Sequence, residues 1–246
     1  MQEFNLLEKA GLSQIKERSK LRTVSLEIRE AAKRMDFLFY DGNRKYGYGG
    51  YVYDGRWKAV AKTAAERYNL NNESKVLIDR CNKGFLVFDL KRLVPGITVY
   101  GIHAAEYALN HAMDGYGRWA LVNEEEIGDP RIIEQRARDE ITPFLIKDDS
   151  NNMPFKENFF DTVISIENAC AYPEPQCREV IREIVRVTKD NGKRSYIQND
   201  SWRNESERQI FLKWTLLCKT FLNLEQWASL YKEENYEGDY GFTIIT

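Results

Sequence analysis

The sequence has few of the residues that build disulfide scaffolds or metal centres: 4 cysteines and 2 histidines occur among 246 residues. The cysteines stand far apart, which argues against a disulfide-stapled fold. No apolar run approaches the roughly 20 residues of a membrane-spanning helix, and the first residues lack the apolar core of a signal peptide. Lysine and arginine total 36 against 38 acidic residues, so a strongly basic nucleic-acid-binding surface is not expected. These absences predict a cytoplasmic globular protein that binds neither nucleic acid nor membrane.

Tyrosine stands out, with 14 in the chain, and its distribution is uneven. Residues 40–57 hold Tyr46, Tyr48, Tyr51 and Tyr53 beside five glycines, a composition that excludes regular structure. Tyrosines offer rigid rings with polar tips, and glycines permit close backbone approach. Arg44 adds a charge suited to a phosphate or carboxylate. The segment therefore predicts either a substrate-binding lid or a packed aromatic hairpin.

The hydrophobic spacing divides the chain into elements. Residues 1–39, with Leu21, Val24 and Ile28, have the spacing of one or two amphipathic helices. From residue 75 onward, short apolar runs alternate with helical patterns. Strands are expected at 76–78, 97–102, 144–146, 161–166, 195–198 and 240–245. Helices are expected at 57–68, 84–93, 104–113, 175–188, 205–221 and 224–231.

Strands that alternate with helices predict an α/β fold, with a parallel-rich sheet of about six or seven strands and helices on both faces. Residues 114–141 are charged and irregular, which indicates an insertion with at least one exposed helix. We expect an amino-terminal helical cap with the tyrosine-glycine segment at 1–60 and a Rossmann-like domain at 61–246. Only one strand follows the last helices, so a complete closing antiparallel hairpin is not expected.

In an open parallel sheet, ligands bind beyond the carboxyl ends of the strands. Here several strings resemble the class I S-adenosylmethionine-dependent methyltransferases, over roughly residues 65–246. The family's first motif, an acid followed by Gly-x-Gly-x-Gly, is matched in position by Val76-Leu77-Ile78-Asp79-Arg80-Cys81-Asn82-Lys83-Gly84. Met153-Pro154-Phe155 and the following Phe160-Asp161 resemble the family's passage into the fourth strand. Residues 182–193 resemble the family's later helix-to-strand turn.

The resemblance implies a cofactor loop after the first strand, and the sequence departs from it. Ile78 stands in the place of the acid, Arg80 and Asn82 in the places of two glycines, and Gly84 keeps the third. Asn tolerates the left-handed backbone of a glycine position, whereas Arg adopts it poorly. The cofactor-binding candidates on this loop are Asp79, Arg80, Cys81 and Gly84.

Two further anchors follow from the resemblance. His103 stands where the family has the acid that holds the ribose, and Asp149 keeps the acid that faces the adenine amino group. Three interpretations stay open: the chain binds S-adenosylmethionine through substitute contacts, keeps the fold for another ligand or chemistry, or is a non-catalytic partner-binding paralogue. The first predicts a methyltransferase-like enzyme that acts on a small polar or phosphorylated metabolite, sugars included.

Glu167, Asp200 and Tyr172 follow expected strands and are the candidates for acid–base work. The alternative for such loop carboxylates is helix capping. Residues 202–231 are rich in aromatics, Trp202 among them, and these residues suit a substrate-binding cap, core packing or a homodimer surface. The absence of Cys-x-x-Cys and His-x-x-x-His spacing leads us to expect no metal site, even at His103, Asp79 and Cys81.

Arg80 carries the sharpest prediction from the sequence. An inward guanidinium would take the space of the cofactor's methionine part and would suit a carboxylate or phosphate. An outward one would pair with a surface carboxylate and leave the crevice open. We expect the inward arrangement.

Overall fold

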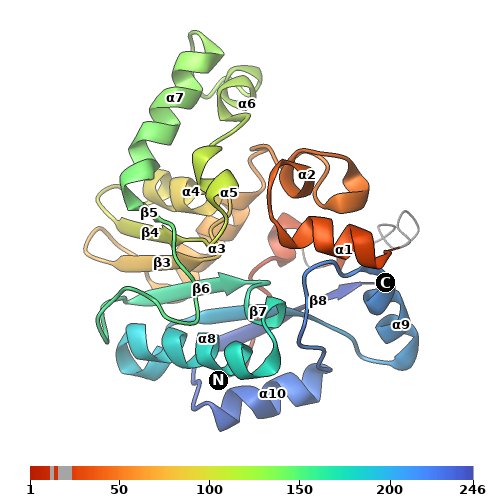
Figure 1. Ribbon diagram of the computed structural model, residues 1–246. Coiled ribbons are helices and arrows are strands. Elements are labelled where there is room, and N and C mark those ends of the chain that lie inside the picture. The colour runs from red at the N-terminus through yellow and green to blue at the C-terminus, as the bar shows by residue number, and fades with distance from the viewer. Residues whose placement is uncertain (12–13, 16–23, 246) are drawn as a thin grey trace.

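The computed structural model describes residues 1–11, 14–15 and 24–245, so Leu21 of the expected first helix lies outside the described residues. Among these residues, eight strands form one sheet (Figure 1). Seven follow the order β1-β8-β7-β6-β3-β4-β5, and β2 pairs with β8 beside this path. The strands are β1 (Gln2–Glu3), β2 (Gln14–Ile15), β3 (Lys75–Asp79), β4 (Thr98–Ile102), β5 (Leu145–Ile146), β6 (Thr162–Ile166), β7 (Tyr196–Ser201) and β8 (Asp239–Ile245).

Every named strand pairing is parallel. The expected α/β class is therefore confirmed, and no antiparallel hairpin closes the sheet within the described part of the chain. The helices are α1 (Leu26–Lys33), α2 (Phe37–Tyr40), α3 (Trp57–Tyr68), α4 (Phe85–Leu93), α5 (Glu106–Asn110), α6 (Tyr116–Val122), α7 (Pro130–Ile141), α8 (Glu174–Val187), α9 (Glu205–Trp214) and α10 (Leu224–Glu233).

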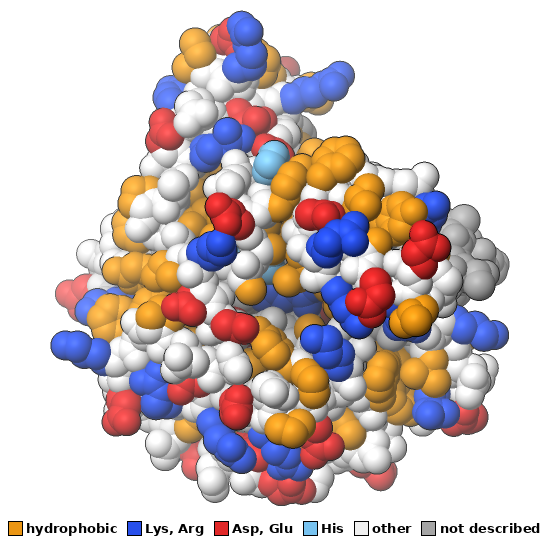
Figure 2. Space-filling view, viewed as in Figure 1, with side chains coloured by type: hydrophobic (Ala, Val, Ile, Leu, Met, Phe, Trp, Pro, Cys, Tyr) orange, Lys and Arg blue, Asp and Glu red, His pale blue; other side chains and the backbone are white. Residues whose placement is uncertain are grey.

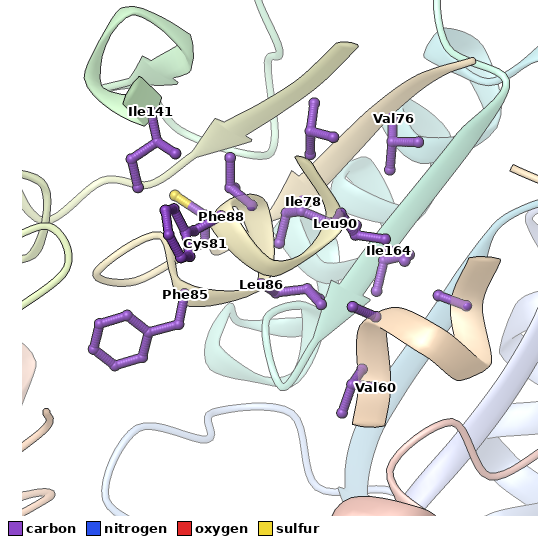
Figure 3. Packing of buried hydrophobic residues seen from close by; sticks show 14 of the residues in the cluster. Val60, Val76, Ile78, Cys81, Phe85, Leu86, Phe88, Leu90, Ile141 and Ile164 are labelled. Carbon is purple, nitrogen blue, oxygen red and sulfur yellow. The ribbon is translucent and has the colours of Figure 1, made fainter. Parts of the chain in front are cut away.

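Alternating strand residues serve two hydrophobic layers, as the two-residue period of a strand requires. Val76 and Ile78 face the layer of α3, α4, α6 and α7 (Figure 3). Leu77 faces the opposite layer, built mainly from α8 and α10. Core packing accounts for Trp202, Phe211, Trp227 and Tyr231, which are buried in this second layer, but not for Phe221, which is 41% exposed.

Three elements differ from the sequence predictions. The helix expected at 104–113 is the short α5, and the chain reaches a left-handed backbone at Met113, whose φ is 60°. The helix expected at 205–221 ends at Trp214 because Thr215 is extended. The strand β1 was not expected. The insertion at 114–141 holds two helices, α6 and α7, which project from the body of the molecule (Figure 1).

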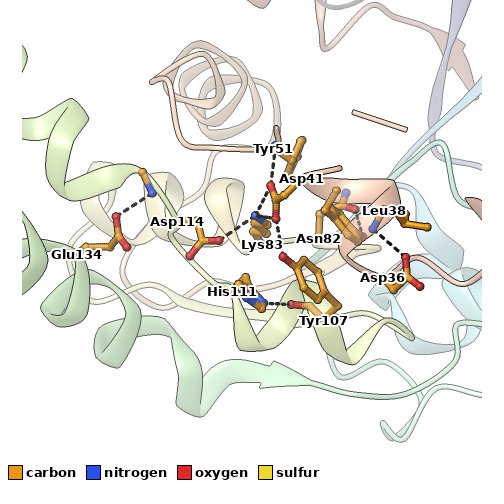
Figure 4. Close-up of polar contacts among 12 residues, drawn as sticks. Asp36, Leu38, Asp41, Tyr51, Asn82, Lys83, Tyr107, His111, Asp114 and Glu134 are labelled. Carbon is orange, nitrogen blue, oxygen red and sulfur yellow. Dashed lines mark hydrogen bonds and ion pairs between the residues drawn. The ribbon is translucent and has the colours of Figure 1, made fainter. Parts of the chain in front are cut away.

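A buried cation fixes the segment after α2 to the loop after β3 (Figure 4). Lys83 is fully buried on the loop after β3, and its Nζ lies 2.8 Å from Asp41 Oδ2 and 2.9 Å from Asp114 Oδ2. Tyr107 donates its hydroxyl to Asp41 at 2.8 Å. Because Asp41 follows α2, this cluster ties the cap to the loop that carries the candidate site.

Candidate functional site

A cavity of about 270 Å³ lies at the carboxyl ends of β3, β6 and β7, beneath the tyrosine-glycine segment. Its walls come from the loop after β3, the turn after β6, the end of β7 and residues 214–218. The space-filling view shows a hollow between the cap and the sheet domain, with basic side chains inside it (Figure 2). This is the strand edge at which parallel sheets bind their ligands.

The loop after β3 has a left-handed backbone at three alternate residues, and only one of the three is glycine. Arg80, Asn82 and Gly84 have φ values of 58°, 51° and 76°, all in the left-handed region. An arginine there carries a conformational cost of roughly 1 kcal/mol or more. Two of these three left-handed positions thus carry side chains, and only the third is glycine.

Arg80 lines the cavity, as the inward arrangement predicts. Its guanidinium donates a hydrogen bond to the backbone carbonyl of Glu167 at the end of β6. Burial alone would lower the pKa of Arg80. The interactions with Tyr48, Tyr40 and Glu167 outweigh burial and raise the pKa, so the guanidinium stays charged. Among the described residues, no carboxylate lies within 4 Å of this cation.

Asp79 has no free carboxylate to offer a ligand. Its oxygens accept hydrogen bonds from Ser150 Oγ at 2.5 Å, Ser165 Oγ at 2.6 Å and Asn168 Nδ2 at 2.8 Å. Burial raises the pKa of Asp79, and these three donors oppose the rise. The carboxylate therefore joins the ends of β3 and β6 to the loop after β5.

His103 is closed off by the cap. Tyr40 of α2 is fully buried, and its hydroxyl lies 2.7 Å from His103 Nε2 and donates to Asn82 Oδ1 at 2.9 Å. Burial, with a smaller contribution from Arg80, lowers the pKa of His103 to about 3, so the ring is neutral. With the Tyr40 proton directed at Asn82, the network assigns the proton of His103 to Nε2.

Asp149 and Tyr172 lie outside the cavity. Asp149 is exposed, and it accepts a hydrogen bond from the Tyr172 hydroxyl. Gly84 is also outside the cavity lining, at the amino end of α4, where an added Cβ would lie 2.5 Å from Ile141 Cδ1. The structure therefore separates these three residues from Arg80 and Cys81, which line the cavity.

The tyrosine-glycine segment divides between the cavity and its surroundings. Tyr48 and Tyr51 line the cavity, with ring centroids 4.4 Å apart, and Arg44 lines it beside them. Tyr53 instead donates its hydroxyl to Asp89, and Tyr46 lies against α1. Trp202 also lies outside the cavity lining and packs on Phe211, with ring centroids 5.2 Å apart.

Glu167 and Asp200 both line the cavity. Burial, followed by the charges of Glu167 and Cys170, holds the pKa of Asp200 well above its usual range. Its Oδ1 has no hydrogen-bond partner among the residues that the structure describes. Residues that sequence reasoning did not assign to the site are Trp57, Cys170 and the stretch 214–218, which was expected to be helical.

S-adenosylmethionine does not fit these residues in the manner that the family uses. Ile78 provides no acid for the amino group, and Arg80 projects into the cavity from a glycine position. The position of the ribose-binding acid is a neutral histidine whose Nε2 is already bonded to Tyr40.

Comparison with known proteins relates part of the chain to one family. Residues 81–195 match the family model described as a methyltransferase domain. No curated protein matches the chain. Among the described residues, no helix has the length and apolar character to cross a membrane.

Solved structures are similar to the chain at low sequence identity. A chain of the Haloferax volcanii complex that contains the Trm112 methyltransferase activator is 16% identical, with a TM-score of 0.50, and the match covers 86% of this chain and 76% of that one. Geranyl diphosphate C-methyltransferase from Streptomyces coelicolor is 11% identical, with a TM-score of 0.48 and coverage of 74% and 64%. The YcgJ protein of Bacillus subtilis is 13% identical, with a TM-score of 0.47 and coverage of 71% and 66%.

The parallel sheet with this strand order defines a Rossmann-like protein of the class I methyltransferase fold. Residues 81–195, somewhat less than half of the chain, are similar to the methyltransferase domain family.

Proposed function

We propose that the chain binds a small anionic metabolite, a carboxylate or a phosphate, in the cavity beneath the tyrosine-glycine segment. The observation that carries this proposal is the inward guanidinium of Arg80, which donates to a backbone carbonyl and forms no ion pair with another described residue. A cation in a cavity that lacks an ion-pair partner is costly unless a ligand neutralises it. A guanidinium also presents its donors in a planar fork that matches carboxylates and phosphates.

The surrounding walls suit a small, partly apolar ligand. Tyr51 stacks on Phe85, with ring centroids 5.1 Å apart, so its ring is held rigidly at the cavity wall. Trp57, at the start of α3, adds a further aromatic surface. Rigid aromatic walls with a few fixed polar or charged groups are typical of sites that orient a small ligand, and Arg44 and Arg56 line this cavity together with Arg80. The tyrosine-glycine segment thus acts as the lid in this proposal.

Methyl transfer from S-adenosylmethionine to a small polar or phosphorylated acceptor, including a sugar, is the second candidate function. It is favoured by the left-handed backbone at Arg80, Asn82 and Gly84, which preserves the shape of the family's cofactor loop. In this alternative Glu167, at the cavity wall, is the first candidate for the base and Asp200 the second. It requires that Tyr40 and the Arg80 side chain move away from the cofactor's position.

Equilibrium binding separates the two functions. Calorimetric titration of the full chain with inorganic phosphate, glucose 6-phosphate and succinate tests the first, and titration with S-adenosylhomocysteine tests the second. Replacing Arg80 with Gln removes the charge and keeps most of the side-chain volume. We expect the affinity for whichever anion binds to fall about 10- to 100-fold, because hydrogen bonds to charged groups contribute about 1.5–3 kcal/mol.

The matched control is Arg118→Gln, because Arg118 is exposed on α6 and the change in net charge is identical. Equal anion affinity in the parent and Arg80→Gln would exclude Arg80 as the anchor. Micromolar binding of S-adenosylhomocysteine to the parent, with no binding of the anions, would replace the first function by the second. A combined Ile78→Asp, Arg80→Gly and His103→Asp variant is expected to gain affinity for S-adenosylhomocysteine, since it restores two acids and one glycine.

A further inference from the structure

The cavity wall formed by β7 and its neighbours holds a second group of side chains with a different chemistry. We propose that Cys170, Asp200 and Cys218 form a zinc-binding site with one coordination position open to the cavity. The anion proposal does not require this site, and the site does not require the anion.

The three ligand atoms are already gathered. All lie within 4.8 Å of one another. The two sulfur atoms are 3.0 Å apart, and Cys218 Sγ lies 3.6 Å from Asp200 Oδ2. Around a tetrahedral zinc, atoms at about 2.0–2.3 Å from the metal are roughly 3.3–3.8 Å apart. The two thiols therefore need to separate by less than about 1 Å, and Asp200 is already at a suitable distance from Cys218.

The backbone holds these side chains in place before any metal arrives. Cys170 lies in the turn after β6, and its N–H donates to Asn199 Oδ1 at 3.1 Å. Its carbonyl accepts hydrogen bonds from the N–H groups of Lys219 at 2.8 Å and Thr220 at 3.1 Å. These bonds fix the segment of Cys218 against the segment of Cys170. The early end of α9 at Trp214 is what allows this segment to cross the strand ends.

Asp200 supplies an observation that is independent of the cysteines. The residue is 5% exposed, and its Oδ1 is buried with no hydrogen-bond partner among the described residues. A buried carboxylate oxygen without a partner costs free energy. The Asp200 carboxylate is thus not fully satisfied by the described protein groups, while its other oxygen, Oδ2, is the one that lies near Cys218 Sγ.

The donor set selects the metal. Two thiolates favour soft or borderline ions, and a carboxylate is an accepted third ligand of zinc. All three residues line the cavity, so the fourth position faces it and is available to water. Three protein ligands with one open position are the arrangement of catalytic zinc sites rather than structural ones.

Metal binding exchanges protons for the cation. Contact with Cys170, followed by burial, holds the pKa of the Cys218 thiol well above its usual range, and Asp200 is likewise raised. Zinc binds the thiolate and carboxylate forms of its ligands, and two thiolates with one carboxylate around the ion leave a net charge of −1 beside the Arg80 guanidinium. Zinc affinity is thus expected to rise with pH.

Cobalt titration of the reduced, chelator-treated full chain is the direct test, because Co²⁺ reports its ligands by absorption. We expect one cobalt per chain, a thiolate-to-cobalt charge-transfer band in the near ultraviolet, visible bands of a tetrahedral ion, and displacement by zinc. Cys170→Ser and Cys218→Ser should each remove about half of the charge-transfer intensity and weaken zinc binding at least 100-fold. Asp200→Asn should weaken zinc binding while it keeps that intensity.

Cys81→Ser is the matched control, because Cys81 is a buried cysteine of the same cavity wall but is outside the group. It should leave the cobalt spectrum and stoichiometry unchanged. Circular dichroism of each variant establishes that the fold is intact, and Asp200→Asn, which preserves shape, covers the case in which a serine variant unfolds. Three results would overturn the proposal. The chain could bind less than one cobalt, the bound cobalt could have an octahedral spectrum, or the Cys170→Ser, Cys218→Ser and Asp200→Asn variants could all keep the spectrum of the parent. A reduced chain that takes no metal but forms a Cys170–Cys218 disulfide in air would also overturn it.

Discussion

Replacement of Lys83 by Met tests whether the buried cation joins the cap to the sheet domain. The ammonium is fully buried and meets Asp41 Oδ1 at 3.0 Å, Asp41 Oδ2 at 2.8 Å and Asp114 Oδ2 at 2.9 Å. Removing one partner of a buried ion pair costs about 3–5 kcal/mol. The two carboxylates keep exposures of 19% and 23%, so water relieves part of their repulsion. We therefore expect a loss of about 3 kcal/mol in the free energy of unfolding.

Two readouts distinguish this role from a general loss of packing. For a chain of this length, a loss of about 3 kcal/mol corresponds to a fall in Tm of roughly 6–12 °C. Hydrogen exchange should accelerate most in residues 24–56, since Asp41 is the cap's contact with Lys83. Lys58→Met is the control, because the Lys58 and Glu125 side chains are 44% and 43% exposed, and an exposed pair contributes at most about 1 kcal/mol. Equal losses in the two variants would refute the reasoning.

The same cluster sets a pH dependence. Burial raises the pKa of Asp41, but hydrogen bonds from Lys83, the Tyr51 N–H and Tyr107 outweigh it, and the net pKa is lowered. Because the folded pKa lies below the unfolded one, Asp41 stabilises the fold above about pH 4 and loses this contribution as the pH falls further. In Lys83→Met this acid-dependent part of the loss should shrink, which urea unfolding at pH 3 and pH 6 measures.

Two further predictions concern the helices of the first hydrophobic layer. Burial raises the pKa of Asp89 to about 7, against an opposing hydrogen bond from Tyr53, so ionisation of Asp89 costs stability as the pH rises from about 4 to about 7. The free energy of unfolding of Asp89→Asn, measured in urea, should therefore rise by about 2–3 kcal/mol relative to that of the parent between pH 5 and pH 8. A stability difference between the two proteins that does not change with pH would contradict this. At Gly117 an added Cβ would lie 1.8 Å from the carbonyl oxygen of Pro130. Gly117→Ala should therefore separate α6 from α7 and lower the free energy of unfolding by about 1–3 kcal/mol. Hydrogen exchange should become faster in residues 116–141 only. Unchanged exchange there would show that the backbone can accommodate the methyl group.

The sheet and most helices could be predicted from the sequence because their patterns are local. The runs at 76–78 and 161–166 are buried strands, and the spacing at 175–188 gives α8 almost residue for residue. The end of α9 could not be predicted in this way. Residues 205–221 continue a helical spacing, yet Thr215 turns the chain so that its carbonyl and that of Leu212 can accept hydrogen bonds from Arg29, at 2.6 and 2.8 Å. That contact joins residues 183 or more positions apart, and no local pattern contains it.

The candidate site could be predicted only in part, because some of its residues follow a rule of strand order and others are brought together by long-range contacts. The rule that parallel sheets bind ligands at the carboxyl ends of their strands selected the regions of Arg80, Glu167 and Asp200, and all three line the cavity. The rule could not separate Tyr48 from Tyr53, because side chains of an irregular segment follow no period. It also could not pair Cys170 with Cys218, since their 48-residue separation resembles no metal-binding spacing.

The side chains of His103 and Tyr40 depend on each other, because the Tyr40 hydroxyl is the hydrogen-bond partner of the buried His103 ring. A carboxylate at position 103, which is 3% exposed, would be a buried charge unless a ligand's hydroxyls satisfied it. A neutral imidazole can instead be satisfied by a single hydroxyl, and Tyr40 provides it from the cap. The Tyr40 hydroxyl then donates to Asn82 Oδ1, so the same tyrosine also satisfies the side chain that replaces a glycine. The segment of Tyr40, the loop after β3 and the end of β4 are thus closed against one another at His103. The cavity lies beside this contact, and Arg80 and the Cys170–Asp200–Cys218 group line it.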